Sequence, residues 1–334
     1  MELSNIFVSI IIPVIELNDY LRESIYYISK LSHPYFEIIL IPNNPINSGL
    51  NNDHRLSLKF IPAGKIGPAD KRDIGAKFAK GEILAFIDDD AYPRKDWLTN
   101  ALKHFKDPEV AAVGGPAVTP EHDSFWQKVS GAVFLSRFAG GHPDRYWPGK
   151  GVYEVDDLPS VNLLVRKDIF EKVGGFNCKY WPGEDTKLCL AIKKLNKKII
   201  YDPDVFVWHH RRASFLKHLK QAGNYGLHRG FFAKRYPENS RKFRYFLPSL
   251  LVLFLVFGFL LANVFKPLFK PYLTGILVYI TTIFLGIIDI NRKIKNIKIS
   301  LATLPYTIGT HIWYGIRFLQ GFLFTKELKS KLGR

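Results

Sequence analysis

Three aspartates stand directly after an apolar run in this sequence, and their side chains offer the oxygen atoms that divalent cations prefer. The run Ile-Leu-Ala-Phe-Ile at residues 83–87 predicts a buried strand, and Asp88, Asp89 and Asp90 follow it. Because strand side chains alternate, we expect Asp88 and Asp90 on one side and Asp89 on the other. Ligands of open α/β sheets bind at the carboxyl ends of strands, so we predict a cation site here. The alternative interpretation is a solvated acidic turn.

A second acidic pair, Glu184 and Asp185, follows Gly183 at the expected start of a helix that ends near residue 195. An aspartate cluster suited to a cation, followed by this acidic pair and a late histidine pair, suggests transfer of a group from a nucleotide diphosphate to a hydroxyl. Such a transfer needs a carboxylate base within hydrogen-bond reach of the hydroxyl, and we predict that Asp185 is this base. A helix N-terminus keeps such a carboxylate ionised, although it also makes it a weaker base. The alternative is ordinary capping of the first helical turn.

Two adjacent histidines, His209 and His210, end the same part of the sequence. A histidine that joins Asp88 and Asp90 as a third ligand favours Mn²⁺ over Mg²⁺. The cation would neutralise the charge that a departing nucleoside diphosphate gains. An exposed or core histidine pair is the alternative, so the prediction depends on the order and combination of all these groups.

Strands and helices alternate in the first 210 residues, which predicts βαβ units, an α/β fold and a mostly parallel central sheet. The predicted strands cover 7–13, 36–41, 56–61, 83–87, 110–113, 161–165, 198–201 and 205–208. The predicted helices begin at Asn18 or Asp19, at 67, near 93–96, at 125, at 167 and at 184. Residues 121–158 combine a helix over 125–138 with glycine- and proline-rich loops, and we interpret this segment as a lid or an acceptor-binding element.

The composition of the 334 residues limits the possible partners. The formal net charge of +17 indicates an anionic partner, which is nucleic acid, phospholipid or a phosphorylated substrate. A hydrophobic content of 47% is enough for a sizeable core. Cys178 and Cys189 are the only cysteines, which argues against a disulfide framework and is typical of a reducing compartment.

Residues 211–244 are strongly basic and aromatic, with ten Lys or Arg residues and a single acid, Glu238. Cations interleaved with apolar rings are typical of a segment that lies in the membrane interface, where each cation near anionic lipid contributes about 1 kcal/mol. A nucleic-acid surface is the alternative interpretation, and the apolar segments that follow argue against it.

Residues 245–334 predict an all-α membrane domain with two to three transmembrane helices. The candidate spans are 245–265, 271–288 and, interrupted by Arg317, 299–324. The connection at 291–298 holds four basic residues, so the positive-inside rule places it, and the basic side of the first span, in the cytoplasm. A third span would put the basic tail at 326–334 outside, against this rule, and the alternative is a re-entrant or surface-lying segment. A buried helical domain is the alternative to spanning helices.

Taken together, these motifs resemble the family 2 glycosyltransferases of the GT-A fold over about residues 7–230. The most specific match is the block from Gly67 to Asp90, which holds Arg72-Asp-Ile-Gly75 and Lys80-Gly-Glu-Ile-Leu-Ala-Phe-Ile-Asp-Asp-Asp90. Further matches are Val8-Ser-Ile-Ile-Ile-Pro13, Val161-Asn162 with Arg166, Gly174-Gly-Phe176, Gly183-Glu-Asp185 and Pro203-Asp204 to His209-His210.

The resemblance implies a role for each matching residue. Asp88 and Asp90 correspond to the metal- and diphosphate-binding Asp-X-Asp, with His209 as the late metal ligand, His210 as the alternative ligand, and Mn²⁺ or Mg²⁺ as the cofactor. Asp185, with Glu184 beside it, corresponds to the catalytic base of an inverting single displacement. The implied nucleotide-sugar-binding residues are Pro13, Glu16, Asn43, Lys71, Arg72, Asp88 and Asp89. The predicted acceptor-binding residues are Asn162 and Trp181 in the acceptor half of the family pattern, together with Arg211 and Arg212, which begin the basic stretch and are expected to meet the phosphate of a lipid-linked acceptor.

The sequence also departs from the family pattern. Residues 14–16 read Val-Ile-Glu where the family usually has Thr-Tyr-Asn, and residues 42–45 read Pro-Asn-Asn-Pro where an Asp usually reads the base. Asn43 is the expected substitute, which leaves the nucleotide open. Asp73 stands where the family usually has Asn. The Gln-X-X-Arg-Trp of processive synthases is absent, because residues 221–225 read Gln-Ala-Gly-Asn-Tyr.

We therefore predict a GT-A glycosyltransferase domain over 1–210, a basic amphipathic interfacial segment over 211–244 and a multi-pass membrane domain over 245–334. The predicted enzyme moves one sugar from a nucleotide diphosphate sugar to a hydroxyl or phosphate of a lipid-linked, polyprenyl-phosphate type acceptor at the cytoplasmic face of the bilayer. The alternatives are a processive polysaccharide synthase and a non-catalytic membrane scaffold with a degenerate transferase domain. We expect no nucleic-acid partner.

Overall fold

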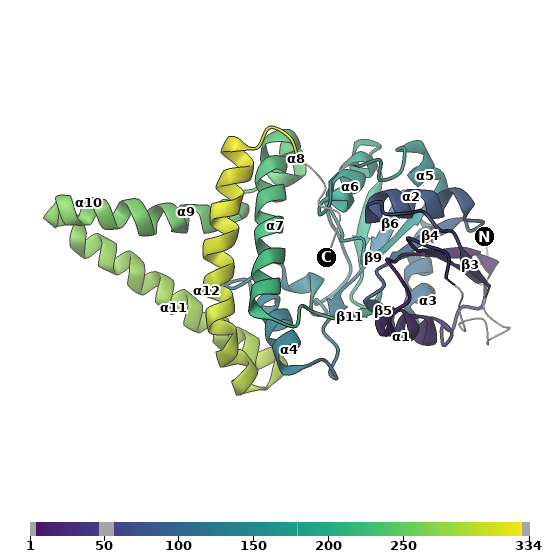
Figure 1. Cartoon of the computed structure of the whole chain (residues 1–334), viewed down its shortest axis with the longest axis horizontal. Helices are drawn as coiled ribbons and strands as arrows, with labels where there is room; N and C mark the ends of the chain where they lie inside the picture. Colours follow the sequence, from purple (N-terminus) through teal and green to yellow (C-terminus); the bar gives the residue numbers. More distant parts are fainter. Residues whose placement is uncertain (1–4, 47–56, 179, 329–334) are drawn as a thin grey trace. The chain divides into compact units, whose positions relative to one another are not determined.

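The computed structural model describes residues 5–46, 57–178 and 180–328, and these form two compact units (Figure 1). The sheet unit holds the described residues of 1–118 and 147–210. The helical unit holds residues 119–146 and 211–328. A segment from the middle of the α/β part of the sequence thus belongs to the helical unit.

A large mixed sheet forms the centre of the sheet unit. Its strands, in spatial order, are β3 (Leu58–Phe60), β2 (Phe36–Ile41), β1 (Val8–Pro13), β4 (Ile83–Ile87), β9 (Asn162–Arg166), β6 (Val110–Gly114), β10 (Lys198–Tyr201) and β8 (Tyr153–Glu154). β1 pairs in parallel with β2 and β4, β2 with β3, and β6 with β10. The mostly parallel sheet is confirmed, but β9 runs antiparallel between β4 and β6, which the alternation of strands and helices did not predict.

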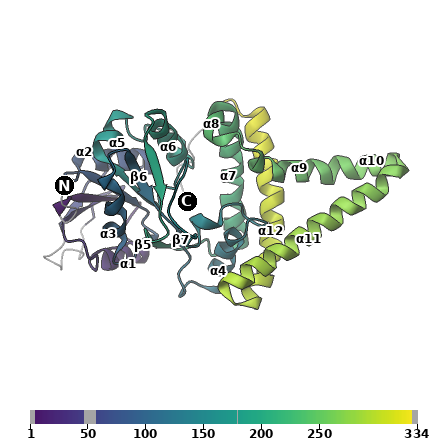
Figure 2. The same cartoon turned by 180° about the vertical axis from the view of Figure 1, so that it is seen from behind.

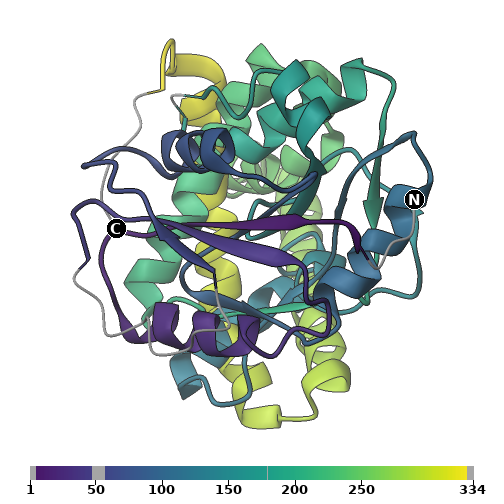
Figure 3. The same cartoon turned by 90° about the vertical axis from the view of Figure 1, so that its right-hand side faces the viewer.

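Helices cover both faces of this sheet, because its strands are apolar on both sides. Ile83, Ala85 and Ile87 of β4 face one core, and Leu84 and Phe86 face the other. The first core includes side chains of α1 (Asp19–Ile28) and α3 (Trp97–Leu102). The second includes side chains of α2 (Pro68–Phe78), α5 (Lys167–Lys172) and α6 (Glu184–Lys194). Figure 3 shows α1 and α2 on opposite sides of the strands.

A second, small sheet belongs to the same unit. Its strands are β5 (Ala91–Pro93), β11 (Val207–His209) and β7 (Ala117–Val118), in the order β5-β11-β7. β11 runs antiparallel to β5 and pairs His209 with Ala91. The register therefore brings the end of β11 beside the residue that follows Asp90.

The helical unit consists of α4 (Phe125–Ala132), α7 (Phe215–Arg235), α8 (Pro237–Ser240), α9 (Leu247–Leu253), α10 (Phe259–Val264), α11 (Phe269–Ile294) and α12 (Ile297–Leu319), with short 3-10 and π turns between them. Figures 1 and 2 show α7 and α12 side by side, with α9–α10 and α11 extending away from them as a hairpin. A Cβ added at Gly230 would lie 2.1 Å from the carbonyl oxygen of Phe318, so the α7 and α12 backbones are in direct contact.

Among the described residues, two helical stretches are long and apolar enough to cross a membrane: Leu247–Val264 and Lys266–Ile294. Only 11% and 22% of their most apolar windows are buried, which differs from the buried core helix of a soluble protein. The chain is therefore membrane-associated. The third candidate, 299–324, corresponds to α12 and the π turn Gln320–Phe324, and it does not meet the same criteria.

Candidate functional site

The aspartates after β4 converge through a turn. β4 ends at Ile87, and the Ala91 N–H donates to the Asp88 carbonyl oxygen at 3.1 Å. The two carboxylates come together, as predicted. They do so through this turn, because the strand ends before Asp88 and its side-chain alternation does not reach Asp90. Asp89 lies apart from this pair and accepts a hydrogen bond from Asn18 Nδ2 at 3.1 Å.

His209 reaches the two aspartates because β11 pairs with β5. The His210 N–H donates to the Asp90 carbonyl oxygen at 2.9 Å, and His209 Nε2 lies 3.2 Å from Asp90 Oδ1. Donor atoms of Asp88, Asp90 and His209 all lie within 4.8 Å of one another. The side chain of His210 is directed elsewhere, with Nε2 at 2.8 Å from Glu23 Oε2.

This donor set fits a divalent cation. Two carboxylates supply the hard oxygen ligands that Mg²⁺ and Mn²⁺ share, and the imidazole favours Mn²⁺. The side chains of Asp90 and His209 are 4% and 12% exposed, whereas that of Asp88 is 22% exposed. A ligand can therefore approach the set from the side of Asp88.

Arg72 of α2 connects this cluster with the start of α6. Its guanidinium lies 2.5 Å from Asp88 Oδ1 through one nitrogen and 2.8 Å from Glu184 Oε1 through another. The arginine is 2% exposed, and its guanidinium stacks 5.5 Å from the centre of the Phe176 ring. Burial raises the pKa of Glu184 to about 7, the nearby Asp185 adds to this rise, and Arg72 opposes it.

Asp185 occupies the first turn of α6 beside Glu184, but in a different environment. It is half-buried, and its Oδ1 accepts a hydrogen bond from the Thr186 N–H at 2.7 Å. Gly183 precedes the helix with a φ of +114°, a conformation that glycine adopts without strain. Successive residues of a helix point about 100° apart, so Glu184 can pair with Arg72 while Asp185 has another direction.

The predicted nucleotide-binding residues gather where β1, β2 and α2 meet. Lys71 Nζ donates to the Val14 carbonyl oxygen and to Asn43 Oδ1, both at 2.5 Å. The Asn43 N–H in turn donates to the Ile15 carbonyl oxygen at 3.0 Å. Burial lowers the pKa of Lys71, and the charge of Asp89 opposes this. Asn43 is thereby fixed between the two strand ends.

Pro13 and Glu16 flank the same strand end. Pro13 is the buried last residue of β1, so it shapes the strand end. Glu16 is exposed, and its carbonyl oxygen accepts a hydrogen bond from Asn18 Nδ2 at 3.3 Å.

The predicted acceptor-binding residues are divided between the two units: Asn162 and Trp181 belong to the sheet unit, and Arg211 and Arg212 belong to the helical unit. Asn162 is fully buried: its Oδ1 accepts from Trp97 Nε1 at 2.8 Å, and its Nδ2 donates to the Val205 carbonyl oxygen at 2.7 Å. This side chain therefore holds β9 to the loop before β11. Trp181 is half-buried in the loop before α6. Arg211 and Arg212 begin the second part of the helical unit.

Arg211 has partners within the helical unit. Its Nε donates to Thr119 Oγ1 at 3.2 Å, and its guanidinium lies 5.0 Å from the centre of the Tyr146 ring. The helical unit thus joins the residues that follow the histidine pair to the inserted segment 119–146.

Two polar groups of the sheet unit were missed by the sequence analysis. Asp73 accepts hydrogen bonds from the N–H groups of Phe176 and Asn177 at 2.8 and 2.9 Å, so it fixes the loop before α6. This contact accounts for the acid at a position where the family usually has Asn. The second group contains Asp204, which the sequence matched to the family pattern without predicting that Arg94 is its partner.

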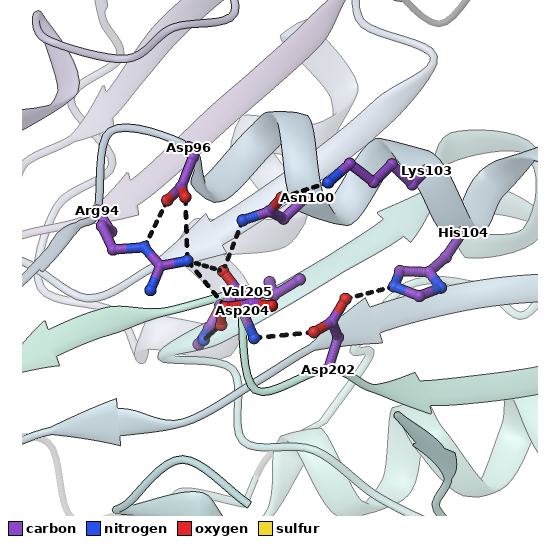
Figure 4. A network of polar contacts seen from close by, with 9 residues as sticks. Arg94, Asp96, Asn100, Lys103, His104, Asp202, Asp204 and Val205 are labelled. Atoms are coloured by element: carbon purple, nitrogen blue, oxygen red, sulfur yellow. Dashed lines mark hydrogen bonds and ion pairs between the residues drawn. The ribbon is translucent and has the colours of Figure 1, made fainter. Parts of the chain in front are cut away.

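The second group holds the loop between β10 and β11, and Figure 4 shows it. Arg94 Nε donates to Asp96 Oδ1 at 2.5 Å, and an Arg94 terminal nitrogen donates to Asp204 Oδ1 at 3.2 Å. His104 Nε2 lies 2.6 Å from Asp202 Oδ2. Burial opposes ionisation of Asp202, but the hydrogen bonds from His104 and from the Asp204 N–H lower its pKa. The network thus fixes the entry to β11, which ends at His209.

Comparison with known proteins agrees with this architecture. The Glycosyl transferase family 2 model matches residues 9–174. Pre-mycofactocin glycosyltransferase of Mycobacterium tuberculosis is 28% identical over 179 residues, which cover 52% of this chain and 36% of that protein. This chain therefore spans only about a third of that relative's length.

A second relative matches over nearly its whole length. Dolichyl N-acetyl-alpha-D-glucosaminyl phosphate 3-beta-D-2,3-diacetamido-2,3-dideoxy-beta-D-glucuronosyltransferase of Methanococcus voltae is 24% identical over 334 residues, covering 95% of this chain and 97% of that protein. Among solved structures, the mannosyltransferase PcManGT from Pyrobaculum calidifontis in complex with GDP-Man and Mn²⁺ has a TM-score of 0.56 and 19% identity, covering 96% of this chain and 88% of that one.

The predicted resemblance and fold class are thus confirmed. The last comparison is evidence of fold, because its sequence identity is low. The large sheet with helices on both faces, the family match and the structural likeness agree, and the chain belongs to family 2 of the glycosyltransferases, with the GT-A fold and an all-helical C-terminal region.

Proposed function

We propose that this protein is a membrane-anchored glycosyltransferase that moves one sugar from a nucleotide diphosphate sugar to a hydroxyl or phosphate of a lipid-linked acceptor. The observation that carries the proposal is the convergence of Asp88, Asp90 and His209 beside the Arg72–Glu184 pair. These groups come from four separate parts of the sheet unit, and a solvated acidic turn would not collect them.

The donor end of the site is formed by α2 and the ends of β1, β2 and β4. Lys71 fixes Asn43, so that its amide can contact the base, and Arg72 offers positive charge beside Asp88. Asp88, Asp90 and His209 would hold Mn²⁺ or Mg²⁺, which when bound supplies positive charge beside the diphosphate of the donor. The carboxylate–imidazole donor set and the Mn²⁺ in the complex of PcManGT support Mn²⁺.

Asp185 is the proposed base. Its half-buried carboxylate lies in the first turn of α6, and it would accept the proton of the acceptor hydroxyl. The oxygen of that hydroxyl then bonds to the anomeric carbon as the bond to the diphosphate breaks, which inverts the configuration. Glu184 acts through Arg72 as a positioning residue, because its carboxylate is already paired.

A lipid-linked acceptor is supported by the membrane association and by the dolichyl-phosphate-linked substrate in the name of the Methanococcus voltae relative. Arg211 and Arg212, which follow the histidine pair directly, are proposed to meet the phosphate of this acceptor. We further propose that residues 211–244 lie in the interface, that the hairpin of Leu247–Val264 and Lys266–Ile294 spans the bilayer, and that the sheet unit is cytoplasmic.

The first test is a screen of nucleotide diphosphate sugars for release of nucleoside diphosphate with Mn²⁺ in the presence of polyprenyl phosphates or polyprenyl-phosphate-linked sugars. Transfer to the lipid with inverted anomeric configuration is expected. A product that carries a long ladder of sugars would favour a processive synthase, and products formed only on water-soluble sugars would contradict the lipid acceptor.

The variant Asp185→Asn tests the base. We expect transfer to fall by about 10²–10⁴-fold, because the acceptor proton loses its carboxylate, while Mn²⁺-dependent nucleotide binding is retained. Glu171→Gln, at a 63% exposed position on α5, is the matched control and should transfer like the unmodified chain. Unchanged transfer by Asp185→Asn would remove this residue from the mechanism, and absence of any donor turnover by the unmodified chain would favour the scaffold alternative.

A further inference from the structure

The stretch Ser124–Phe138, within the inserted segment 119–146, exposes three large aromatic side chains. Ser124 and Gln127 form a capping box at the start of α4, so the helix begins at a defined residue. Phe125 and Trp126 directly follow the cap and are 42% and 51% exposed. Phe138, the last residue of the stretch, is 45% exposed. Three large rings thus remain on the outside of one short segment.

The other face of the segment is fixed to α7 and α12 by a buried polar chain. Ser130 Oγ lies 2.8 Å from His218 Nδ1, and His218 Nε2 lies 2.8 Å from Thr310 Oγ1. All three side chains are buried, and burial lowers the pKa of His218 to about 4. A neutral imidazole donates through one nitrogen and accepts through the other, so it can bridge both hydroxyls. The segment is therefore anchored on the long helices of its unit.

The segment also contacts the end of the second candidate span. Lys293 Nζ, near the end of α11, donates to the Leu135 carbonyl oxygen. Just after the stretch, the Ala139 carbonyl oxygen lies 2.9 Å from His311 Nε2 of α12. A Cβ added at Gly286 would lie 3.4 Å from Phe138 Cβ. The exposed ring of Phe138 is thus next to α11 where its last turns approach the α11–α12 connection.

The neighbouring helices also expose apolar and basic side chains. The Trp126 ring stacks on Tyr306 of α12 with an interplanar angle of 12° and 6.3 Å between centroids. Toward its N-terminus, α12 exposes Ile297 and Leu301, which are 54% and 53% exposed. The exposed cations of the α11–α12 connection are Arg292, Lys295 and Lys298. Aromatic rings beside lysines and arginines are typical of the level at which headgroups meet acyl chains.

We propose that Ser124–Phe138 is a membrane-interface anchor, in which Phe125 and Trp126 enter the headgroup region of an anionic phospholipid bilayer. The occupant is lipid because this surface is continuous with the end of a candidate span and is flanked by cations that attract anionic headgroups. The anchor rests on the proposed embedding of the hairpin, and it is independent of the sugar and of the acceptor. It fastens to the bilayer part of the inserted segment 119–146, which is joined to the sheet unit at Val118 and Trp147.

An environment-sensitive fluorophore at position 126 tests the anchor. Trp126→Cys, labelled with a nitrobenzoxadiazole maleimide, is reconstituted in nanodiscs of phosphatidylcholine with phosphatidylglycerol, without and with lipids that carry a shallow spin label. Phe78→Cys is the matched control, because Phe78 is a 49% exposed ring on α2. The native Cys178 and Cys189 are buried, and the unmodified chain measures their background labelling.

We expect blue-shifted emission and at least about twofold quenching at position 126, with neither effect at position 78. Equal emission and quenching at the two positions would overturn the anchor. As a second measurement that needs no label, Trp126→Phe should lower the share of tryptophan fluorescence quenched by brominated lipids, and an unchanged share would also overturn it. Failure of the unmodified chain to float with liposomes would instead overturn the embedding of the hairpin and the anchor with it, whatever the outcome of the transfer assay.

Discussion

Two arginines of the sheet unit each connect two carboxylates from distant parts of the chain, and they differ in burial. Arg72 pairs with Asp88 and Glu184 and is 2% exposed. The Arg94 side chain is 33% exposed, and one of its partners, Asp204, is 68% exposed. Both arginines act in the same region. Arg72 contacts an aspartate after β4, and Arg94 fixes the loop that enters β11. For an arginine, holding carboxylates in place and stabilising the fold are therefore two different effects.

Burial changes the consequence of losing each arginine. A carboxylate left alone in the interior has neither water nor a cation, so breaking a buried pair costs about 3–5 kcal/mol. An exposed carboxylate regains water, and an exposed pair contributes about 0–1 kcal/mol. We therefore expect the two arginines to differ strongly in stability effects, although both organise the site.

The largest effect is expected for Arg72→Met. Glu184 and Asp88 would lose their cation, and the free energy of unfolding should fall by about 3–5 kcal/mol. Thermal unfolding of the purified chain in detergent, followed by intrinsic fluorescence, measures this. Donor turnover should also be lost.

The double variant Arg72→Met with Glu184→Leu is the control for this effect. It removes both buried charges, so much of the stability should return, while nucleotide binding should not. If the double variant were as unstable as Arg72→Met alone, loss of packing rather than an uncompensated charge would explain the instability.

A smaller effect is expected from pH through Glu184. Its pKa is raised by burial from the ordinary value of 4.5 to about 7. The folded chain therefore favours the protonated form, so the stability that this group contributes is present below pH 4.5 and is lost as the pH rises through 7. Glu184→Gln removes this titration, and the melting temperature of the unmodified chain should fall relative to the variant between pH 4.5 and 7.

Glu171→Gln on the exposed face of α5 is the control and should follow the unmodified chain across the range. A constant difference between the unmodified chain and Glu184→Gln from pH 4.5 to 7.5 would show that Glu184 does not titrate there. The expected difference in stability between Arg72 and Arg94 would then be tested only by the Arg72 and Arg94 variants.

The acidic residues proposed for the site were predictable because each pair lies at the end of a strand or the start of a helix. Asp88 and Asp90 were found because the apolar run before them ends abruptly, and Glu184 and Asp185 because they begin a helix. Their pairing was not predictable, since Arg72 and Glu184 are 112 residues apart and meet only after α2 and α6 pack on the same face of the sheet. The carboxylates of Asp88 and Asp90 come together through the turn at Asp88–Ala91, and strand periodicity does not predict this turn.

Asn162 shows the limit from the other side. The family pattern implied acceptor binding for this residue, and in the structure β9 enters the middle of the sheet antiparallel to its neighbours, where the Asn162 amide is fully buried. The helix expected over 125–138 was largely correct as an element, with α4 at Phe125–Ala132 and a 3-10 turn after it. Its packing in the helical unit includes the buried His218 bridge, which no local pattern predicts.

The smallest effect is expected for Arg94→Ala, and its size decides whether burial explains the contrast. The loop around Asp204 keeps other restraints: Asn100 Nδ2 donates to its carbonyl oxygen at 3.1 Å, and its N–H donates to Asp202 Oδ1 at 2.8 Å. Unfolding measurements like those for Arg72→Met should show a loss of no more than about 1 kcal/mol. The concentration of Mn²⁺ that gives half-maximal donor turnover should also remain within about twofold, because the strand that carries His209 keeps its entry. A loss as large as that of Arg72→Met would mean that the number of loop contacts, and not burial, decides what an arginine pair contributes in this fold.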